Sequence, residues 1–178
     1  PLYSDIQGPS VLEEARRRHG NPKLRSSDIE MKDLFVAVKD YYLEPEPTKN
    51  LMDFCMNHQL SMTNLLLLGI RTYLSKVNNG QEDITIQNFI SRRSTHDEWT
   101  SGGSRTIMFP CRTVIAPETD FLSAAYEIQN MQNRIYMHSN YDPALIMDEM
   151  RKRYNTPEHT GYESCYLTYQ PMTVTVEN

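Results

Sequence analysis

The stretch LSMTNLLLLGIRTYLSKVNNGQEDITIQNFISRR, from Leu60 to Arg93, decides the fold. Its first half repeats apolar residues at helical spacing behind Ser61, a good N-cap, and therefore predicts a helix. The apolar surface extends almost all round this helix, which is typical of a helix buried between layers. Asn78-Asn79-Gly80 tolerates positive φ and ends the helix, and the β-branched segment 83–90 predicts a core strand. A buried helix that leads into a buried strand indicates a layered α/β or α+β core.

The size and charge of the chain limit the classes of protein that it can belong to. Its 178 residues suffice for one domain, or for one lobe of something larger. A net charge of -5 gives no electrostatic reason to expect a nucleic-acid partner. The longest apolar run, Leu65 to Ile70, is too short to cross a membrane. The start, Pro1-Leu2-Tyr3, has neither an initiator Met nor a signal peptide, and predicts a piece cut from a longer protein.

The three cysteines, Cys55, Cys111 and Cys165, are widely spaced and form no CxxC pair. A disulfide framework or a zinc site is therefore not expected, and a reducing cytoplasmic location is the better prediction.

The N-terminal flank divides at residue 33. Residues 1–33 are expected to be a linker or inter-lobe segment with a short exposed helix over Val11–His19. Residues 34–178 are expected to form the main lobe, which begins with a strand over 34–43. Glu44-Pro45-Glu46-Pro47 is expected to close that strand because proline removes donors, and Thr48 to cap a helix through His58.

The C-terminal flank continues the alternation of strands and helices. After a polar loop over 91–105, residues 105–116 predict a strand in which Pro110 indicates an edge or a bulge. Thr119 or Asp120 caps a helix with one apolar stripe, and Asp142-Pro143 starts another helix. Further along, the sequence predicts strands over Tyr166–Tyr169 and around residues 174–176.

Chemical motifs are scarce. None of the five histidines stands at the i, i+4 spacing of a helical metal pair, and no GxSxG motif or phosphate-binding glycine loop occurs. His96 is expected in a solvated loop, His138 in a structural position at a helix end, and Cys111 as a buried inert thiol. Taken alone, these residues indicate a lobe without a self-contained active site.

Several segments in a fixed order carry a family resemblance. The helix Ser61–Leu74 and the following Asn79-Gly80-Gln81-Glu82-Asp83-Ile84 look like a long core helix and a gly-x-x-asp-ile entry into a strand. That strand ends in a characteristic arginine, which falls on Arg93, although Gln87 stands where the family often has glycine. Phe109-Pro110-Cys111-Arg112 resembles the second half of a phe-val-asn-thr, leu-pro-leu-arg motif, whose first half is replaced here by Arg105-Thr106-Ile107-Met108.

The segments that follow agree with the same pattern. Phe121-Leu122 begins the next helix of the family, His138 and Pro143 match a his-x-x-x-x-pro step, and Tyr166 to Tyr169 match a strand. Over roughly residues 34 to 170 the chain therefore resembles the C-terminal lobe of a condensation domain of nonribosomal peptide synthetases. This resemblance implies a chloramphenicol-acetyltransferase-like fold, a layered α/β (α+β) sandwich in which helices flank a mixed sheet.

The resemblance also implies a function in secondary metabolite biosynthesis. The two-lobed parent of such a lobe forms an amide between a donor acyl or peptidyl thioester and an acceptor aminoacyl thioester, both tethered through phosphopantetheine to carrier proteins. Its partners would be the N-terminal lobe and the peptidyl and aminoacyl carrier proteins. The catalytic signature of the family, two adjacent histidines before an asp-gly, belongs to the N-terminal lobe and is absent here. The fragment is therefore expected to be inactive alone, with no cofactor of its own.

Arg93 and Arg112 are the expected binding-site residues, because a buried guanidinium at the wall of a tunnel between the lobes would hold loops through several donors. The alternative is that both make ordinary salt bridges. For the whole chain, one alternative is a non-catalytic acyltransferase-like scaffold that docks carrier proteins. A small trimeric acetyltransferase that uses coenzyme A ranks last, because its his-x-x-x-asp-gly pattern fails at His138, where Asp142-Pro143 follows.

Overall fold

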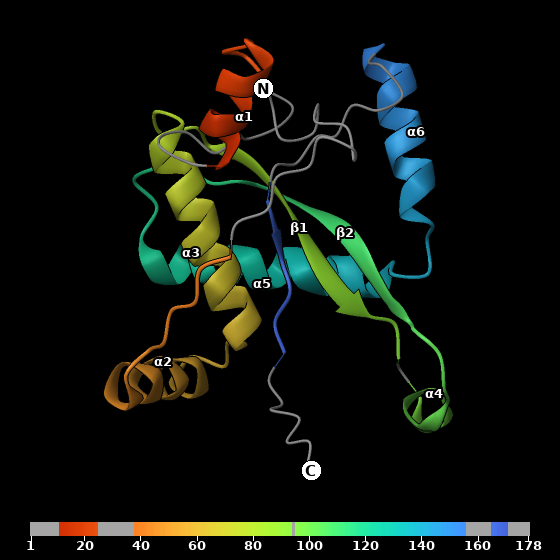
Figure 1. Cartoon of the computed structure of the whole chain (residues 1–178). Helices are drawn as coiled ribbons and strands as arrows, with labels where there is room; N and C mark the ends of the chain where they lie inside the picture. Colours follow the sequence, from red (N-terminus) through yellow and green to blue (C-terminus); the bar gives the residue numbers. More distant parts are fainter. Residues whose placement is uncertain (1–10, 25–37, 94, 156–164, 171–178) are drawn as a thin grey trace, which may run out of the picture.

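The computed structural model describes residues 11–24, 38–93, 95–155 and 165–170. Its elements are α1 (Val11–His19), α2 (Pro45–Asn57), α3 (Met62–Val77), β1 (Asp83–Ser91), α4 (His96–Thr100), β2 (Thr106–Val114), α5 (Phe121–Met137), α6 (Pro143–Tyr154) and β3 (Tyr166–Leu167). Within the described part of the chain the strands form one mixed sheet in the order β2-β1-β3, with β1 antiparallel to β2 and parallel to β3. Helices flank this sheet, as the sequence predicts (Figure 1).

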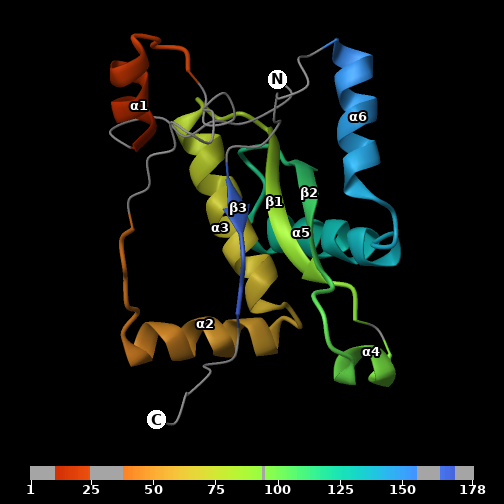
Figure 2. The ribbon, with the colours of Figure 1, turned by 45° about the vertical axis from the view of Figure 1, so that its right-hand side comes forward.

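The core lies between the sheet and the two helices α3 and α5. Figure 2 shows α3 and α5 beside β1 and β2. The centre of this core is closed to water, since Ile84 and Ala125 are 0% exposed and Leu67 is 1% exposed. The remaining buried members of the cluster are Leu60, Leu68, Leu74, Ile86, Cys111, Ile115, Ala124, Ile128 and Met131.

The deciding stretch folds as its sequence predicts. The Ser61 hydroxyl accepts a hydrogen bond from the Asn64 backbone N–H and caps α3. The turn that follows uses positive φ at Asn79 (57°) and Gly80 (76°), which Asn and Gly tolerate best. The strand predicted over 83–90 is β1, with buried side chains on the face toward the helices.

The edge strand β2 confirms the prediction made from Pro110. Backbone hydrogen bonds from Ile115 to Glu82 (3.2 Å) and from Arg92 to Arg105 (3.0 Å) fix which residues of β2 bond to β1. By the alternation of an antiparallel ladder, the even-numbered residues of β2 direct their backbone groups outward. Pro110 is one of them, so the proline stands where its missing N–H leaves the β1–β2 ladder intact.

The helices after β2 begin where the sequence predicts. Asp120 caps α5 through the Ser123 N–H, and Asp142 caps α6, whose first residue is Pro143. The helix α1 also forms over its predicted residues. Among the described residues, none of the helices combines the length and the apolarity needed to cross a membrane.

Two predictions at the start of the main lobe are wrong. Residues 38–43 form no strand and are exposed, while 34–37 lie outside the described residues. The prolines do not close a strand but begin α2, because proline suits the first helical turn, where its missing N–H would have no partner. Glu44, not Thr48, is the N-cap residue, and the Thr48 hydroxyl donates to the Glu44 carbonyl.

Smaller differences occur elsewhere. The loop predicted over 91–105 contains the short helix α4, which the sequence reading missed although Thr95 and Glu98 form a capping box there. The strand predicted over Tyr166–Tyr169 forms only at Tyr166–Leu167. The further strand predicted around residues 174–176 lies outside the described residues. The division at residue 33 stays a prediction.

Candidate functional site

An open groove lies between β2, the C-terminal part of α5 and α6. Its volume is about 850 Å³, which falls in the range of small-molecule sites. Apolar side chains dominate its lining, with Met131 and Ile135 from α5 and Ile146 from α6. The complete lining is Phe109, Pro110, Arg112, Met131, Arg134, Ile135, Met137, His138, Asn140, Tyr141, Ile146 and Glu149. The groove can therefore hold the apolar part of a ligand, with a few polar side chains beside it.

The polar groups of this groove come from the ends of its elements. His138 is the C-cap residue of α5, and its carbonyl accepts from the Tyr141 N–H at 3.0 Å. Its side chain is exposed at the groove, a position that the sequence reading described only as a helix end. Arg112 and Arg134 bring two guanidinium groups to the lining, and Glu149 brings one carboxylate.

Arg112 makes an exposed ion pair with Asp83 across the β1–β2 ladder. Its Nε and Nη2 donate to the two carboxylate oxygens, each at 2.8 Å. The expectation of a buried guanidinium is wrong for this residue, because 66% of its side-chain surface is exposed. The hydrogen bonds from Arg112 hold the pKa of Asp83 below its usual value, and the same pair raises the pKa of Arg112.

Removal of this pair by Asp83→Asn should lower the free energy of unfolding by about 0.5 kcal/mol at pH 7, because exposed ion pairs contribute little. The folded pKa of Asp83 lies below its unfolded value of about 3.9, so the contribution is present above that value and is lost as the pH falls through the folded pKa. Urea unfolding of both proteins at pH 7 and pH 3 tests this expectation. A difference between them that does not shrink at pH 3 would contradict it.

Arg93 lies at the opposite end of β1 and holds the loop that joins β1 to β2. Its Nη1 donates to the Glu98 and Ser101 carbonyls, the latter at 2.9 Å, and its Nη2 donates to the Gly103 carbonyl at 2.5 Å. The side chain is half-buried, and these partners are backbone carbonyls rather than carboxylates. Arg93 therefore holds this loop through several donors, while its expected role in binding at a wall between the lobes stays a prediction. Thr85, which faces Arg112, and Ser91 are six residue steps apart along β1, a separation of about 20 Å, so the two predicted arginines do not meet.

The deeply buried guanidinium belongs to Arg71, which the sequence reading missed. Arg71 is 4% exposed on α3, and its Nη2 donates to the carbonyls of Glu82 and Ile115, both at 2.6 Å. Burial lowers the pKa of Arg71, and nearby Glu82 opposes that change. A signal was present in the sequence, since Arg71 follows Leu67 and Leu68 by four and three residues and so shares their buried face.

A second missed cluster is a polar contact inside the core. The Asn88 amide donates to Gln132 Oε1 at 3.4 Å, and the Gln132 amide lies 3.3 Å from Cys111 Sγ. Burial raises the pKa of the Cys111 thiol to about 12. The thiol therefore stays protonated at neutral pH, which agrees with the predicted inert role. All three cysteines of the chain are free.

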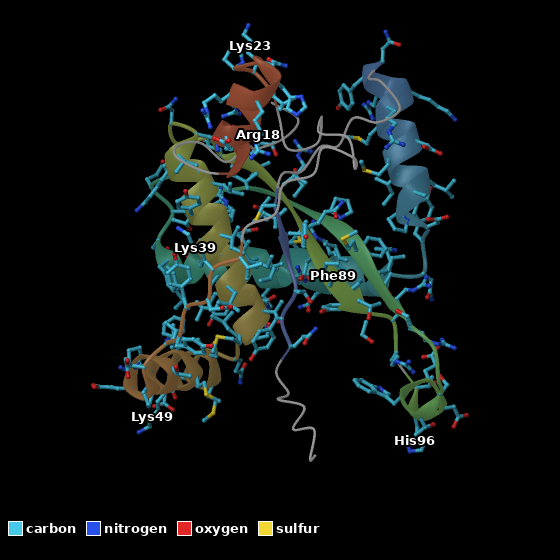
Figure 3. All side chains as sticks on the ribbon, viewed as in Figure 1. Arg18, Lys23, Lys39, Lys49, Phe89 and His96 are labelled. Carbon is cyan, nitrogen blue, oxygen red and sulfur yellow. The ribbon has the colours of Figure 1, made fainter. Side chains whose placement is uncertain are left out.

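The exposed histidine His96 lies on α4 at the projecting end of the β1–β2 pair, as Figure 3 shows. Its predicted exposure to solvent is confirmed, but it begins a short helix rather than lying in a loop, and its ring lies 3.8 Å from the Asp97 carboxylate. Within residues 11–24, 38–93, 95–155 and 165–170, no group of three His, Cys, Asp or Glu side chains is placed to hold a metal ion.

Comparisons with known proteins agree on one family. A family model described as the condensation domain matches residues 21–163. A plipastatin synthase of Bacillus subtilis (strain 168) is 24% identical over 109 residues, which are 61% of this chain and 4% of that protein.

Among solved structures, the first condensation domain of the calcium-dependent antibiotic synthetase, in complex with substrate analogue 3a, matches with a TM-score of 0.58 and 16% identity. The match covers 73% of this chain and 28% of that one. Another structure, of the first condensation domain of the CDA synthetase, matches with a TM-score of 0.55 and 17% identity over 61% of this chain and 25% of that one. The chain thus spans about a quarter of the length of these structures. It shares their fold, which confirms the predicted chloramphenicol-acetyltransferase-like fold. With the family model matching well over half of its residues, the chain belongs to the condensation domain family.

Proposed function

We propose that this chain forms the C-terminal lobe of a condensation domain that joins two carrier-bound substrates by an amide bond. The amine nitrogen of an aminoacyl thioester attacks the carbonyl carbon of an acyl or peptidyl thioester. The C–N bond forms, the C–S bond breaks, and the sulfur leaves as the thiol of the donor's phosphopantetheine arm. The observation that carries this proposal is the family match over residues 21–163.

This chain would hold and position substrates rather than transfer protons. It has no adjacent histidine pair, and the described cysteine beside its groove, Cys111, is a protonated thiol. Its contribution would be a wall with fixed geometry, supported by Arg93 at the loop and by the Arg112–Asp83 pair on the sheet. Holding two tethered substrates in position can supply much of the rate of such a reaction.

The test compares the purified 178-residue chain with the two-lobed parent protein, using carrier proteins loaded with acyl and aminoacyl thioesters. The parent should form the amide, detected by mass spectrometry of the acceptor carrier, and this chain alone should give no product above background. Amide formation by the isolated chain would contradict the proposal that this chain only holds and positions substrates. A parent that binds both carriers but forms no amide would instead support a docking scaffold.

A further inference from the structure

A small cavity lies beside the buried guanidinium of Arg71, between α3, the segment after β2 and the start of α5. Figure 1 shows the segment after β2 passing α3 on its way to α5. The polar part of the lining comes from Arg71, Thr72 and Lys76 of α3 and from Thr119, and Ile115 belongs to its apolar part. The volume is about 220 Å³, which equals the volume of about seven water molecules, so a small ligand fits.

The lining of this cavity carries two positive charges and no carboxylate. Arg71 and Lys76 supply the charges, and none of the lining residues is Asp or Glu. Neither cation forms an ion pair with a carboxylate of the described residues. Glu82 is exposed and acts on Arg71 only through its charge at a distance. The cavity therefore has a positive potential that suits an anion.

Arg71 also has hydrogen-bond donors that the fold does not use. Its Nη2 makes both bonds to the backbone, with the Glu82 and Ile115 carbonyls as acceptors. Among the described residues nothing accepts from its buried Nε, and its Nη1 likewise bonds to none of them. Buried donors without an acceptor are rare in folded proteins. A ligand that brings acceptor oxygens beside this guanidinium would supply what is missing.

The charge of Arg71 favours an anion over water as the source of these oxygens. The residue is 4% exposed, and its burial lowers the pKa of the guanidinium. The charged form is therefore less stable at this place than in water. A water molecule would accept a hydrogen bond but leave the charge without a counter-ion, whereas an anion would provide both.

We propose that this cavity binds a small oxyanion with the chemistry of phosphate, held by the Arg71 guanidinium and the Lys76 ammonium. Guanidinium groups bind phosphate oxygens through charge-assisted hydrogen bonds, and an ammonium adds a point charge. The hydroxyls of Thr72 and Thr119 line the same cavity and can donate to the remaining oxygens. The bound ion would link α3 to the segment that enters α5. This site goes beyond the proposed function and does not depend on it.

The direct test is a titration of the 178-residue chain with inorganic phosphate, followed by amide NMR and by calorimetry. The amide resonances of Thr72, Ala116 and Thr119 should shift, while those of α6 should stay in place. In excess phosphate the melting temperature should rise by about 3 °C above its value in sodium chloride of the same ionic strength, because the ion binds only the folded chain.

Three variants locate the site. Lys76→Gln should weaken phosphate binding about fivefold, because it removes one exposed charge from the lining. Arg71→Lys should weaken it about tenfold, because an ammonium lacks the planar set of donors. The matched control is Lys49→Gln on α2, which makes the same change of charge at an exposed position outside the cavity (Figure 3) and should change the affinity less than twofold. Circular dichroism checks that each variant is folded, and if Arg71→Lys is not, the two Lys→Gln variants decide.

The proposal is overturned if phosphate does not bind, if chloride stabilises the chain equally, or if Lys76→Gln and Lys49→Gln bind phosphate with the same affinity. Resonance shifts confined to the groove beside Arg112 and Arg134 overturn it too, because they would place the anion between β2, α5 and α6. Glycerol 3-phosphate serves as a second ligand. Tighter binding of this ester identifies a phosphate ester as the preferred ligand, and tighter binding of free phosphate identifies the inorganic ion, and both results support an oxyanion site at Arg71.

Discussion

Arg71→Met should lower the free energy of unfolding by about 3 kcal/mol. The guanidinium of Arg71 joins three segments, because it extends from α3 to the carbonyl before β1 and the carbonyl after β2. Methionine keeps the length of the stem but leaves the Glu82 and Ile115 carbonyls without this donor. A buried carbonyl that loses its partner costs about 1 to 3 kcal/mol, and two are affected here.

Urea unfolding followed by circular dichroism gives this difference, and Arg112→Met is the matched control. Arg112 is exposed and pairs with one carboxylate, so its loss should cost less than about 1 kcal/mol. Arg71→Lys should fall between the two, since an ammonium keeps the charge but not the planar set of donors. Equal losses in Arg71→Met and Arg112→Met would show that the buried contacts of Arg71 do not hold the hairpin to α3.

Ile84→Ala should also destabilise the fold by about 3 kcal/mol. Ile84 is 0% exposed at the start of β1 and belongs to the cluster between the sheet and the helices. Its replacement removes three carbon atoms from a packed interior and leaves a cavity, for which losses of about 2 to 5 kcal/mol are typical. Thermal and urea unfolding should both report the loss.

The control for Ile84→Ala is Val114→Ala in the facing strand, one register position away. Val114 is 62% exposed, so its truncation should cost less than about 1 kcal/mol. A loss of less than about 1 kcal/mol in Ile84→Ala would place the centre of the core elsewhere.

Local signals of the sequence predict the elements whose ends are fixed by short-range contacts. Ser61, Asp120 and Asp142 each cap a helix through a hydrogen bond within three residues, so their positions follow from the sequence alone. The edge position of Pro110 follows equally from the donor that proline lacks. The family resemblance, drawn from the order of such elements, identifies the condensation domain correctly.

The sequence-based predictions fail where one residue type is compatible with two different structures. Proline both ends strands and begins helices, and at Pro45 and Pro47 the second meaning holds. The exposure of an arginine depends on contacts across the fold, so sequence reasoning chose Arg112 as a buried group and missed Arg71. The groove between α5 and α6 lay beyond prediction for the same reason, because it depends on how the two helices meet β2.

The place of Pro110 has a consequence for self-association. An edge strand of nine residues such as β2 offers a template on which a second copy could pair its own β2 and continue into an aggregate. Its outward-facing backbone lacks a donor at the centre, since Pro110 has no N–H. If two copies paired edge to edge through β2, the hydrogen bond that the N–H at position 110 would donate would be missing from each copy in the middle of the shared ladder. Among the described residues no strand pairs with the outer edge of β2, and Pro110 would hinder the growth of a shared sheet along that edge.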